Sequence, residues 1–445
     1  MNLSCKKNIY CNYSPKIVRR LLTIKVTINN RLKIRLDQLI DALFFLYLCL
    51  PLSTAVFEVL LSVVDISSYA RVIAVLITYS PFILIVLLKK RDINIVVDFW
   101  IIVFFIAVFF AITYLVHPEY EPWYSRKDYG VLNYVFFPDN GLYIYFFIRL
   151  VNDPKRILKC IKLSAWPMYI YYGLHVVLAT FRGYWMDTSI YGYEIHMSYN
   201  LSLGYSVLIF VLVFLHSALE KRKVSDWIGA IIGISIILIG GSRGPFLDIA
   251  IFLVLYVLLK ISNSRKKVLL ITTIILLAIA LWIFFPLIIT FMVQVLNKFN
   301  VSSRFLIKLL NGSIADDSGR GKIWAVAIEM IKKNPLGYGA MGSRHVIKDL
   351  IYVAHPHQIF LEILIDFGVI VGTVIIVWLV VSSIKIFMMK DLDEWKDVFL
   401  IFFARGCQLL VSLTFWHSIG LWGALAVGVC IHYSHERRSL TDGEQ

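Results

Sequence analysis

The chain has 445 residues, of which 59% are hydrophobic and only 16% are charged, and its mean hydropathy is +0.76. Soluble domains carry about 25% charged residues and rarely contain sustained apolar runs, so the composition excludes an ordinary soluble protein. The formal net charge of +15 could indicate a nucleic-acid partner. The basic residues lie mainly in short segments between apolar runs, as membrane topology requires, and we therefore expect no nucleic-acid partner.

Apolar runs recur along the chain, and each is long enough to cross a hydrocarbon core of about 30 Å. We expect an all-α polytopic membrane protein with about twelve transmembrane helices. The predicted spans are 38–58, 69–88, 95–116, 130–149, 163–181, 200–219, 224–241, 245–260, 268–290, 357–384, 397–415 and 417–433.

The spans divide the chain into five regions. Most lysines and arginines fall in the inner segments if both termini are cytoplasmic, which predicts a multi-pass protein of the cytoplasmic membrane with this orientation. Residues 1–37 form a basic tail, which could lie on the anionic lipids of the inner leaflet or simply set the topology. The expected regions are the cytoplasmic tail 1–37, helices one to nine over 38–290, a long periplasmic loop with short helices over 291–356, helices ten to twelve over 357–433, and the cytoplasmic tail 434–445.

Residues 316–366 form a long, polar segment that is dense in Arg, His, Gly and Pro. Irregular backbone is not tolerated in contact with lipid, so this segment must lie outside the membrane or in a protein-lined cavity. We expect the chemistry of the protein to be located here.

Gly240–Pro245 joins two predicted spans at the outer face. Gly-Gly ends one helix and Pro245 suits the first turn of the next. Backbone N–H groups at that helix start, together with the Arg243 guanidinium, could bind a phosphate. Alternatively, the segment is a tight turn whose arginine reaches the lipid headgroups.

A short helix is predicted inside the loop. Asp316, Asp317 or Ser318 can cap its start, and Asn334-Pro335 ends it. Arg320, Trp324 and Ile328 recur every four residues and share one face. Arg320 suits bidentate binding of a phosphate, or it pairs with one of the preceding aspartates.

His355-Pro356-His357 lies at the outer mouth of the span that begins near residue 357. A His-x-His could be half of a zinc site, but no cluster supplies the other ligands, so we expect no metal. A neutral imidazole is instead a suitable general base for a hydroxyl, although a histidine at a membrane boundary can also be merely polar.

Charged residues within predicted spans usually face a cavity or each other. Arg405 and Asp366 lie at similar depth in neighbouring spans, and we hypothesise that they form a pair. The six cysteines show no Cys-x-x-Cys spacing and none lies in a predicted outer loop, so no disulfide framework is expected.

Three blocks of sequence resemble the O-antigen ligase and polymerase superfamily of bacterial inner-membrane proteins. Gly241–Pro245 looks like its Ser-Arg-Gly motif. Residues 320–324 with Asn334–Gly339 look like its loop helix and glycine turn. His357–Glu362, followed by Gly368, looks like its His-Asn-x-x-Leu-Glu…Gly motif, with Gln358 in place of the usual Asn.

The resemblance implies a metal-independent, cofactor-free glycosyltransferase that acts on undecaprenyl-pyrophosphate-linked oligosaccharides at the periplasmic face. By motif, Arg243 and Arg320 would hold the donor pyrophosphate, and His357 would activate the acceptor hydroxyl for attack with inversion. Arg344, His355, Trp324 and Gln358 are candidate substrate-binding residues. A polysaccharide chain-length regulator is a further candidate partner.

The superfamily contains polymerases, which join lipid-linked repeat units, and ligases, which move finished chains onto lipid A core. The Pro-His-Gln-x-x-Leu-Glu form with the following Asp-Phe-Gly looks more like the polymerases, and a surface-polysaccharide polymerase is our prediction, with a ligase as the alternative. A flippase for the same lipid-linked units is a second alternative, because twelve spans with inner termini suit a carrier. Carriers tend to show internal repeats and broken helices, whereas here the polar motifs gather at the outer edge.

Overall fold

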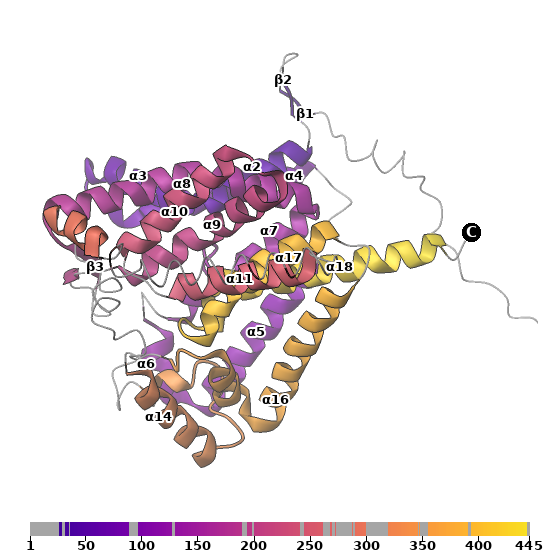
Figure 1. The fold of residues 1–445 in the computed structure, drawn as a ribbon. Coiled ribbons are helices and arrows are strands. Elements are labelled where there is room, and N and C mark those ends of the chain that lie inside the picture. Colours follow the sequence, from indigo (N-terminus) through magenta and orange to yellow (C-terminus); the bar gives the residue numbers. More distant parts are fainter. Residues whose placement is uncertain are drawn as a thin grey trace, which may run out of the picture.

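The computed structural model describes most of the chain as a helical bundle (Figure 1). The described residues are 26–28, 32–34, 36–88, 97–126, 130–188, 194–197, 200–240, 244–260, 290–299, 319–345, 355–389 and 393–442, with the isolated positions 268, 272, 287 and 347.

Two short antiparallel hairpins accompany the helices of the first half of the chain. One pairs β1 with β2 and the other pairs β3 with β4. The elements of this half are β1 (Val26–Ile28), β2 (Leu32–Ile34), α2 (Leu36–Leu48), α3 (Leu50–Ser62), η1 (Ser67–Tyr69), α4 (Ala70–Leu88), α5 (Val97–Val116), η3 (Pro118–Tyr120), α6 (Glu121–Tyr124), η4 (Leu132–Phe136), α7 (Leu142–Val151), α8 (Pro154–Arg182), β3 (Trp185–Thr188) and β4 (Glu194–Met197).

The second half carries the polar loop and the helices that hold it. Its elements are α9 (Leu201–Lys221), α10 (Val224–Gly240), α11 (Gly244–Lys260), α14 (Arg320–Lys333), α16 (Ile359–Met388), α17 (Asp393–Gly406), η6 (Cys407–Leu410), η7 (Phe415–His417) and α18 (Ile419–Asp442). In Figure 1, α14 lies beside the lower end of α16, away from the layer formed by α8, α9 and α10.

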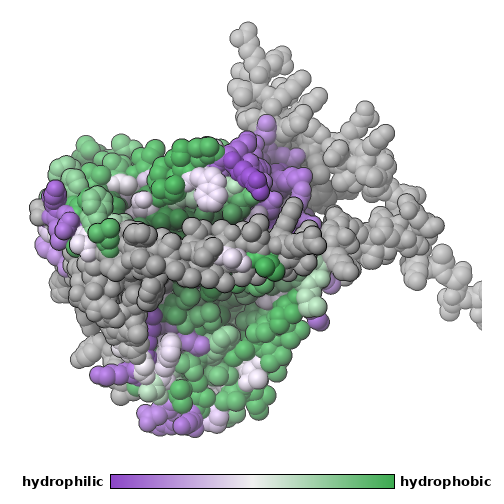
Figure 2. Space-filling view, in the orientation of Figure 1, coloured by the Kyte–Doolittle hydropathy of each residue, from purple (hydrophilic) through white to green (hydrophobic). Residues whose placement is uncertain are grey.

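The helical, membrane-type fold class is confirmed. Three described helices, in α5, α9 and α16, are long and apolar enough to cross a membrane. The α2–α3 pair, bent by 69°, would make a fourth such span. Apolar side chains cover much of the surface in Figure 2, and on α16 Ile370 is 77% exposed. Such exposure is expected of a helix that faces lipid.

The predicted span 130–149 is wrong as a continuous helix. Its first half contains the π-helical turn η4, and Phe137 then leaves the helical conformation before α7 begins. α7 has only 10 residues and is too short to span a bilayer. Its apolar residues instead lie inside the protein, because α7 is enclosed by α2, α8 and α18.

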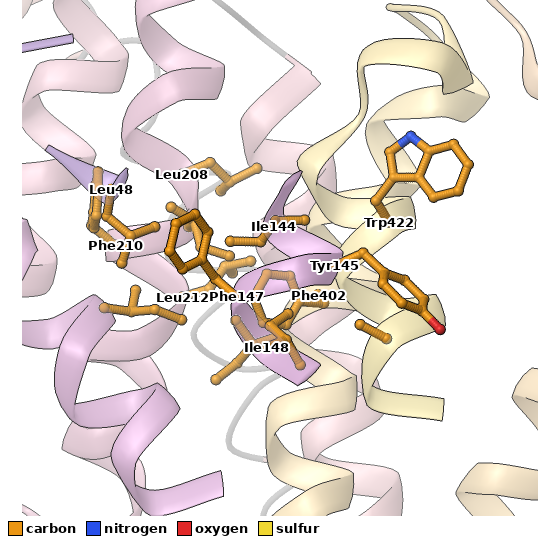
Figure 3. Close-up of a cluster of buried hydrophobic side chains, with 14 of the residues drawn as sticks. Leu48, Ile144, Tyr145, Phe147, Ile148, Leu208, Phe210, Leu212, Phe402 and Trp422 are labelled. Atoms are coloured by element: carbon orange, nitrogen blue, oxygen red, sulfur yellow. The ribbon is translucent and has the colours of Figure 1, made fainter. Parts of the chain in front are cut away.

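The centre of the bundle is built around α7. Ile144 and Phe147 are essentially fully buried, and they lie near Leu208 of α9 and Phe402 of α17 (Figure 3). A helix that is apolar on all sides is stable where other helices surround it. This core joins the N-terminal helices to the helices that follow the polar loop.

The end of the predicted span 397–415 also differs from the structure. α17 ends at Gly406, and two 3₁₀ turns, η6 and η7, precede α18. The hydrophobicity of residues 407–415 suggested a continuous span, but irregular backbone is tolerated at membrane depth where protein surrounds it. Cys407, Leu409 and Phe415 are buried.

Candidate functional site

α14 is the helix predicted inside the polar loop. It begins at Arg320 after Gly319 and ends at Asn334, as the Asn-Pro signal predicted. Asp316, Asp317 and Ser318 lie outside the described residues. Ile323, Ala327 and Met330 form the buried face and pack near α16.

The face that carries Arg320 and Trp324 is therefore only partly covered. Both side chains are half-buried, and Ile328, one turn further along, is 44% exposed. The Trp324 indole N–H finds no hydrogen-bond partner among the described residues. The predicted face thus borders the site and does not form the packing surface of α14.

The glycine turn after α14 fits into a break in α16. Gly368 interrupts the helix with φ 77°, and a Cβ there would lie 2.4 Å from the carbonyl oxygen of Leu336. Gly337, with φ 97°, approaches the same break, and its Cβ would lie 2.5 Å from the Gly368 nitrogen. Only glycine combines this conformation with so close an approach.

Hydrogen bonds from the turn replace those that α16 loses at the break. Tyr338 N–H donates to the Ile365 carbonyl at 2.7 Å, and Gly339 N–H donates to the Asp366 carbonyl at 3.1 Å. Val369 N–H donates to the Pro335 carbonyl at 2.8 Å. The second and third motif blocks, separate in sequence, therefore form one structural unit.

Two buried carboxylates of α16 fasten this unit to the rest of the protein. Glu362 accepts from Thr414 Oγ1 at 2.5 Å and from the Phe415 N–H at 3.3 Å. Asp366 Oδ2 accepts from the Met341 N–H at 3.2 Å and from Trp416 Nε1 at 3.0 Å. Both carboxylates thus hold the segment between α17 and α18 against the glycine turn.

The hypothesised pair between Arg405 and Asp366 is wrong. Asp366 bonds to Met341 and Trp416, and the carboxylate that acts electrostatically on Arg405 is Asp248 of α11. Equal depth in neighbouring spans does not determine which helix faces point at each other.

His357 stands directly before α16 in a constrained conformation. Its φ of 56° lies in the left-handed region, which is uncommon for residues other than glycine. Gln358 next to it is the N-cap of α16, and its Oε1 accepts from the Leu361 N–H at 2.6 Å. The amide of this motif position therefore fixes the helix start immediately beside His357. Strained backbone of this kind clusters at functional sites.

Both histidines of the His-Pro-His segment are half-buried, and both nitrogens of His355 and Nδ1 of His357 are shielded from solvent. The rings of His355 and His357 have centroids 4.2 Å apart. Burial, and then the positive charge of Arg320, lowers the pKa of His357 to about 4. Burial lowers the pKa of His355 well below its usual value, with further contributions from His357 and Arg344. Both imidazoles are therefore neutral near pH 7.

Arg344 is a second arginine that acts on the histidine pair. It is buried, and its Cζ lies 4.6 Å from the centroid of the Tyr134 ring. It acts electrostatically on His355 and on both carboxylates, Glu362 and Asp366. The ring contact and these electrostatic interactions connect four of the candidate residues, namely Arg320, His357, His355 and Arg344.

Arg243, the remaining predicted catalytic residue, lies outside the described residues. The residue that follows it, Gly244, begins α11, and a Cβ on Gly244 would lie 1.6 Å from the Tyr205 hydroxyl oxygen. Arg320 acts electrostatically on Tyr205 as well as on His357. Tyr205 thus lies beside the candidate site. Sequence reasoning missed it, because one tyrosine within an apolar span gives no signal.

Among the described residues, one group has a spacing that could bind a metal ion: His216, Glu220 and Asp397. The ammonium of Lys260 lies 2.8 Å from Asp397 Oδ1 and 3.3 Å from Glu220 Oε1. A cation therefore already occupies the position between these carboxylates. His216 is also about 17 Å along α9 from Tyr205 at 1.5 Å per residue.

The fold and the cluster together define a polytopic membrane protein in which two arginines and a neutral histidine pair lie at the end of a kinked helix. Residues 228–377, about one third of the chain, match the family model described as O-antigen ligase. This match supports the resemblance of residues 228–377 to the O-antigen ligase and polymerase superfamily, whose members are glycosyltransferase-like enzymes. No curated protein and no solved structure gives a significant match.

Proposed function

We propose that the protein is a polymerase of O-antigen or a related surface polysaccharide, and that it joins undecaprenyl-pyrophosphate-linked repeat units at the periplasmic face of the inner membrane. The observation that carries the proposal is the proximity of Arg320 to His357, a neutral imidazole held in left-handed backbone at the mouth of α16. A base beside a cation suits a reaction that takes a proton and releases an anion.

His357 accepts the proton of the acceptor sugar hydroxyl. The hydroxyl oxygen then attacks the anomeric carbon of the donor sugar from the face opposite the leaving group. The bond from that carbon to the pyrophosphate oxygen breaks, and the anomeric configuration inverts. Undecaprenyl pyrophosphate leaves with the bonding electron pair, and Arg320 and Arg243 stabilise its charge.

The supporting residues divide between substrate and scaffold. In this proposal Arg344 and His355 orient the acceptor sugar or the growing chain next to His357. The Trp324 indole lies on the same face of α14 as Arg320 and is available to a sugar ring. Gln358 acts mainly by fixing the start of α16, since its carbonyl oxygen bonds to Leu361.

The second candidate is a ligase that moves the lipid-linked chain onto lipid A core, and the description of the matching family model favours it. Polymerase and ligase share the donor, the base and the leaving group, and they differ in the acceptor. A flippase is the third candidate, and the 69° bend between α2 and α3 is the observation that favours it, since carriers contain broken helices.

Deletion of the gene in its native host, followed by silver-stained gels of the surface polysaccharide, separates these candidates. We expect core carrying a single repeat unit. Bare core with polymer retained on the lipid carrier would show a ligase, and bare core with units trapped inside the cell would show a flippase. An unchanged ladder would contradict all three. Restoration of the ladder by the wild-type gene, but not by one encoding H357A, assigns the effect to the site.

A further inference from the structure

Arg405 is a buried cation that the reaction proposed above does not use. It lies in the last turn of α17, is 6% exposed, and stands outside the segment that matches the family model. Charged residues buried within membrane-spanning segments are costly and usually mark functional sites.

Arg405 lies close to the ring of Tyr205, on which Arg320 also acts. The Cζ of Arg405 is 5.6 Å from the centroid of the Tyr205 ring. Both arginines act electrostatically on Tyr205. Arg320 lies inside the matched segment and Arg405 lies beyond it, yet both act on one buried tyrosine of the protein interior.

The hydrogen bonding of Arg405 is incomplete among the described residues. Its guanidinium donates to Gln408 Oε1, which is one bond for a group with five N–H donors. Asp248 is the carboxylate that acts on Arg405, yet neither of its oxygens accepts a hydrogen bond from a described residue. Asp248 is fully buried. The Arg405 guanidinium therefore retains N–H donors that no described residue accepts, and such buried donors are available to a further ligand.

We propose that Arg405 binds the lipid-proximal phosphate of the polyprenyl pyrophosphate, while Arg320 binds the phosphate next to the sugar. The inference rests on the proposed function and adds a phosphate subsite to it. Arg320 acts on His357, so it serves the reacting end of the donor. Arg405 is not among the groups that act on His357, so it serves the phosphate farther from the reacting carbon, which continues into the lipid chain. Asp248 balances the charge of Arg405 when no donor is bound.

The two arginines should then affect the affinity for different lipids. Undecaprenyl phosphate has only the lipid-proximal phosphate, whereas undecaprenyl pyrophosphate has both. R405Q should weaken binding of both ligands about tenfold or more, the loss expected for a charge-assisted hydrogen bond. R320Q should weaken the pyrophosphate by a similar factor and leave the affinity for the monophosphate within about twofold. D248N removes a negative charge that opposes the ligand and should tighten both about threefold or more.

The experiment measures the affinities of these two lipids for the purified full-length protein in detergent, with K322Q on the exposed side of α14 as a matched control. Affinities of R405Q within twofold of wild type, with a loss for R320Q, would overturn the inference and leave the proposed function standing. No loss in either variant would contradict both. Weaker binding by D248N would overturn the role of Asp248.

If R405Q does not fold, the double variant R405Q/D248N takes its place, because it removes both buried charges. We expect this variant to bind undecaprenyl phosphate weakly. Wild-type affinity for this lipid would overturn the subsite.

Discussion

The imidazole rings of His355 and His357 lie 4.2 Å apart at their centroids, with their planes at 62°. No described residue hydrogen-bonds to either nitrogen of His355 or to Nδ1 of His357. The rings are thus oriented by packing, by Pro356 between them and by the left-handed backbone at His357. This arrangement suits a base that must remain neutral and receive a proton from a substrate.

His357→Ala should reduce the rate of polymer formation by about 10²–10⁴-fold, because it removes the proposed general base. The rate can be measured with purified protein and lipid-linked repeat units. His355→Gln is the comparison, and we expect a smaller loss that appears mainly in KM, since His355 borders the acceptor. Full activity of His357→Ala in folded protein would remove the basis of the mechanism.

Arg320→Gln should lower kcat by about 10²–10³-fold, since it removes a cation that stabilises the departing pyrophosphate. Lys322→Gln is a matched control, because it removes one positive charge from an exposed position two residues along the same helix. Equal losses in the two variants would indicate a general effect of charge on the loop. Arg320→Lys should recover part of the activity, as it keeps the charge but not the bidentate geometry.

In the pH profile of kcat/KM, the midpoint of the acid limb should lie near pH 4 and not near the ordinary histidine pKa of about 6.5. The neutral form is the active base, so activity is lost as the pH decreases through the pKa of His357. Arg320→Gln removes a positive charge that lowers this pKa, and should therefore move the limb to higher pH. A limb that does not move would show that another group limits the rate.

The same pKa difference affects folding. Between about pH 6.5 and pH 4 the unfolded chain binds a proton that the folded protein does not accept on His357. Acidification over this range therefore favours unfolding. In thermal denaturation of the purified protein, His357→Gln should show less loss of stability over this range than wild type.

Gly368→Ala should destabilise the protein by about 1–3 kcal/mol or more, because alanine is strained at φ 77° and its Cβ would collide with the Leu336 carbonyl. Gly173→Ala is the matched control, since it lies within α8 and its Cβ would meet no atom within 4 Å. Thermal unfolding should show a lower Tm for the first variant and an unchanged or higher Tm for the second. Equal Tm values would contradict the role assigned to the helix break.

Much of the fold could be predicted from the sequence because lipid imposes one length on apolar helices. α5, α9 and α16 all lie where apolar runs indicated. The failure over 130–149 came from the same rule, since a short apolar helix at the protein centre has the composition of a membrane span. Hydropathy measures how strongly a side chain favours leaving water, and it does not distinguish burial in lipid from burial in protein.

The site could be predicted in part for a different reason. His357 and Arg320 belong to motifs, and motifs preserve the spacing along the chain. The position of Tyr205 beside the site and the hydrogen bond between Trp416 and Asp366 depend on contacts between distant segments. A single sequence does not indicate such contacts. The Asp366–Arg405 hypothesis was wrong for this reason. The hydropathy pattern indicates the depth of a residue in the membrane, but it does not indicate how each helix is rotated about its axis.

The interlock between the glycine turn and the break in α16 also affects how genetic screens of this protein can be interpreted. Gly337, Gly368 and Glu362 bond to or pack against other parts of the chain, so their replacement harms assembly before it harms chemistry. A scan that scores only lost polysaccharide would rank them beside His357. Parallel measurement of protein abundance in the membrane separates the two groups, and variants that are abundant but inactive will outline the surface that touches substrate.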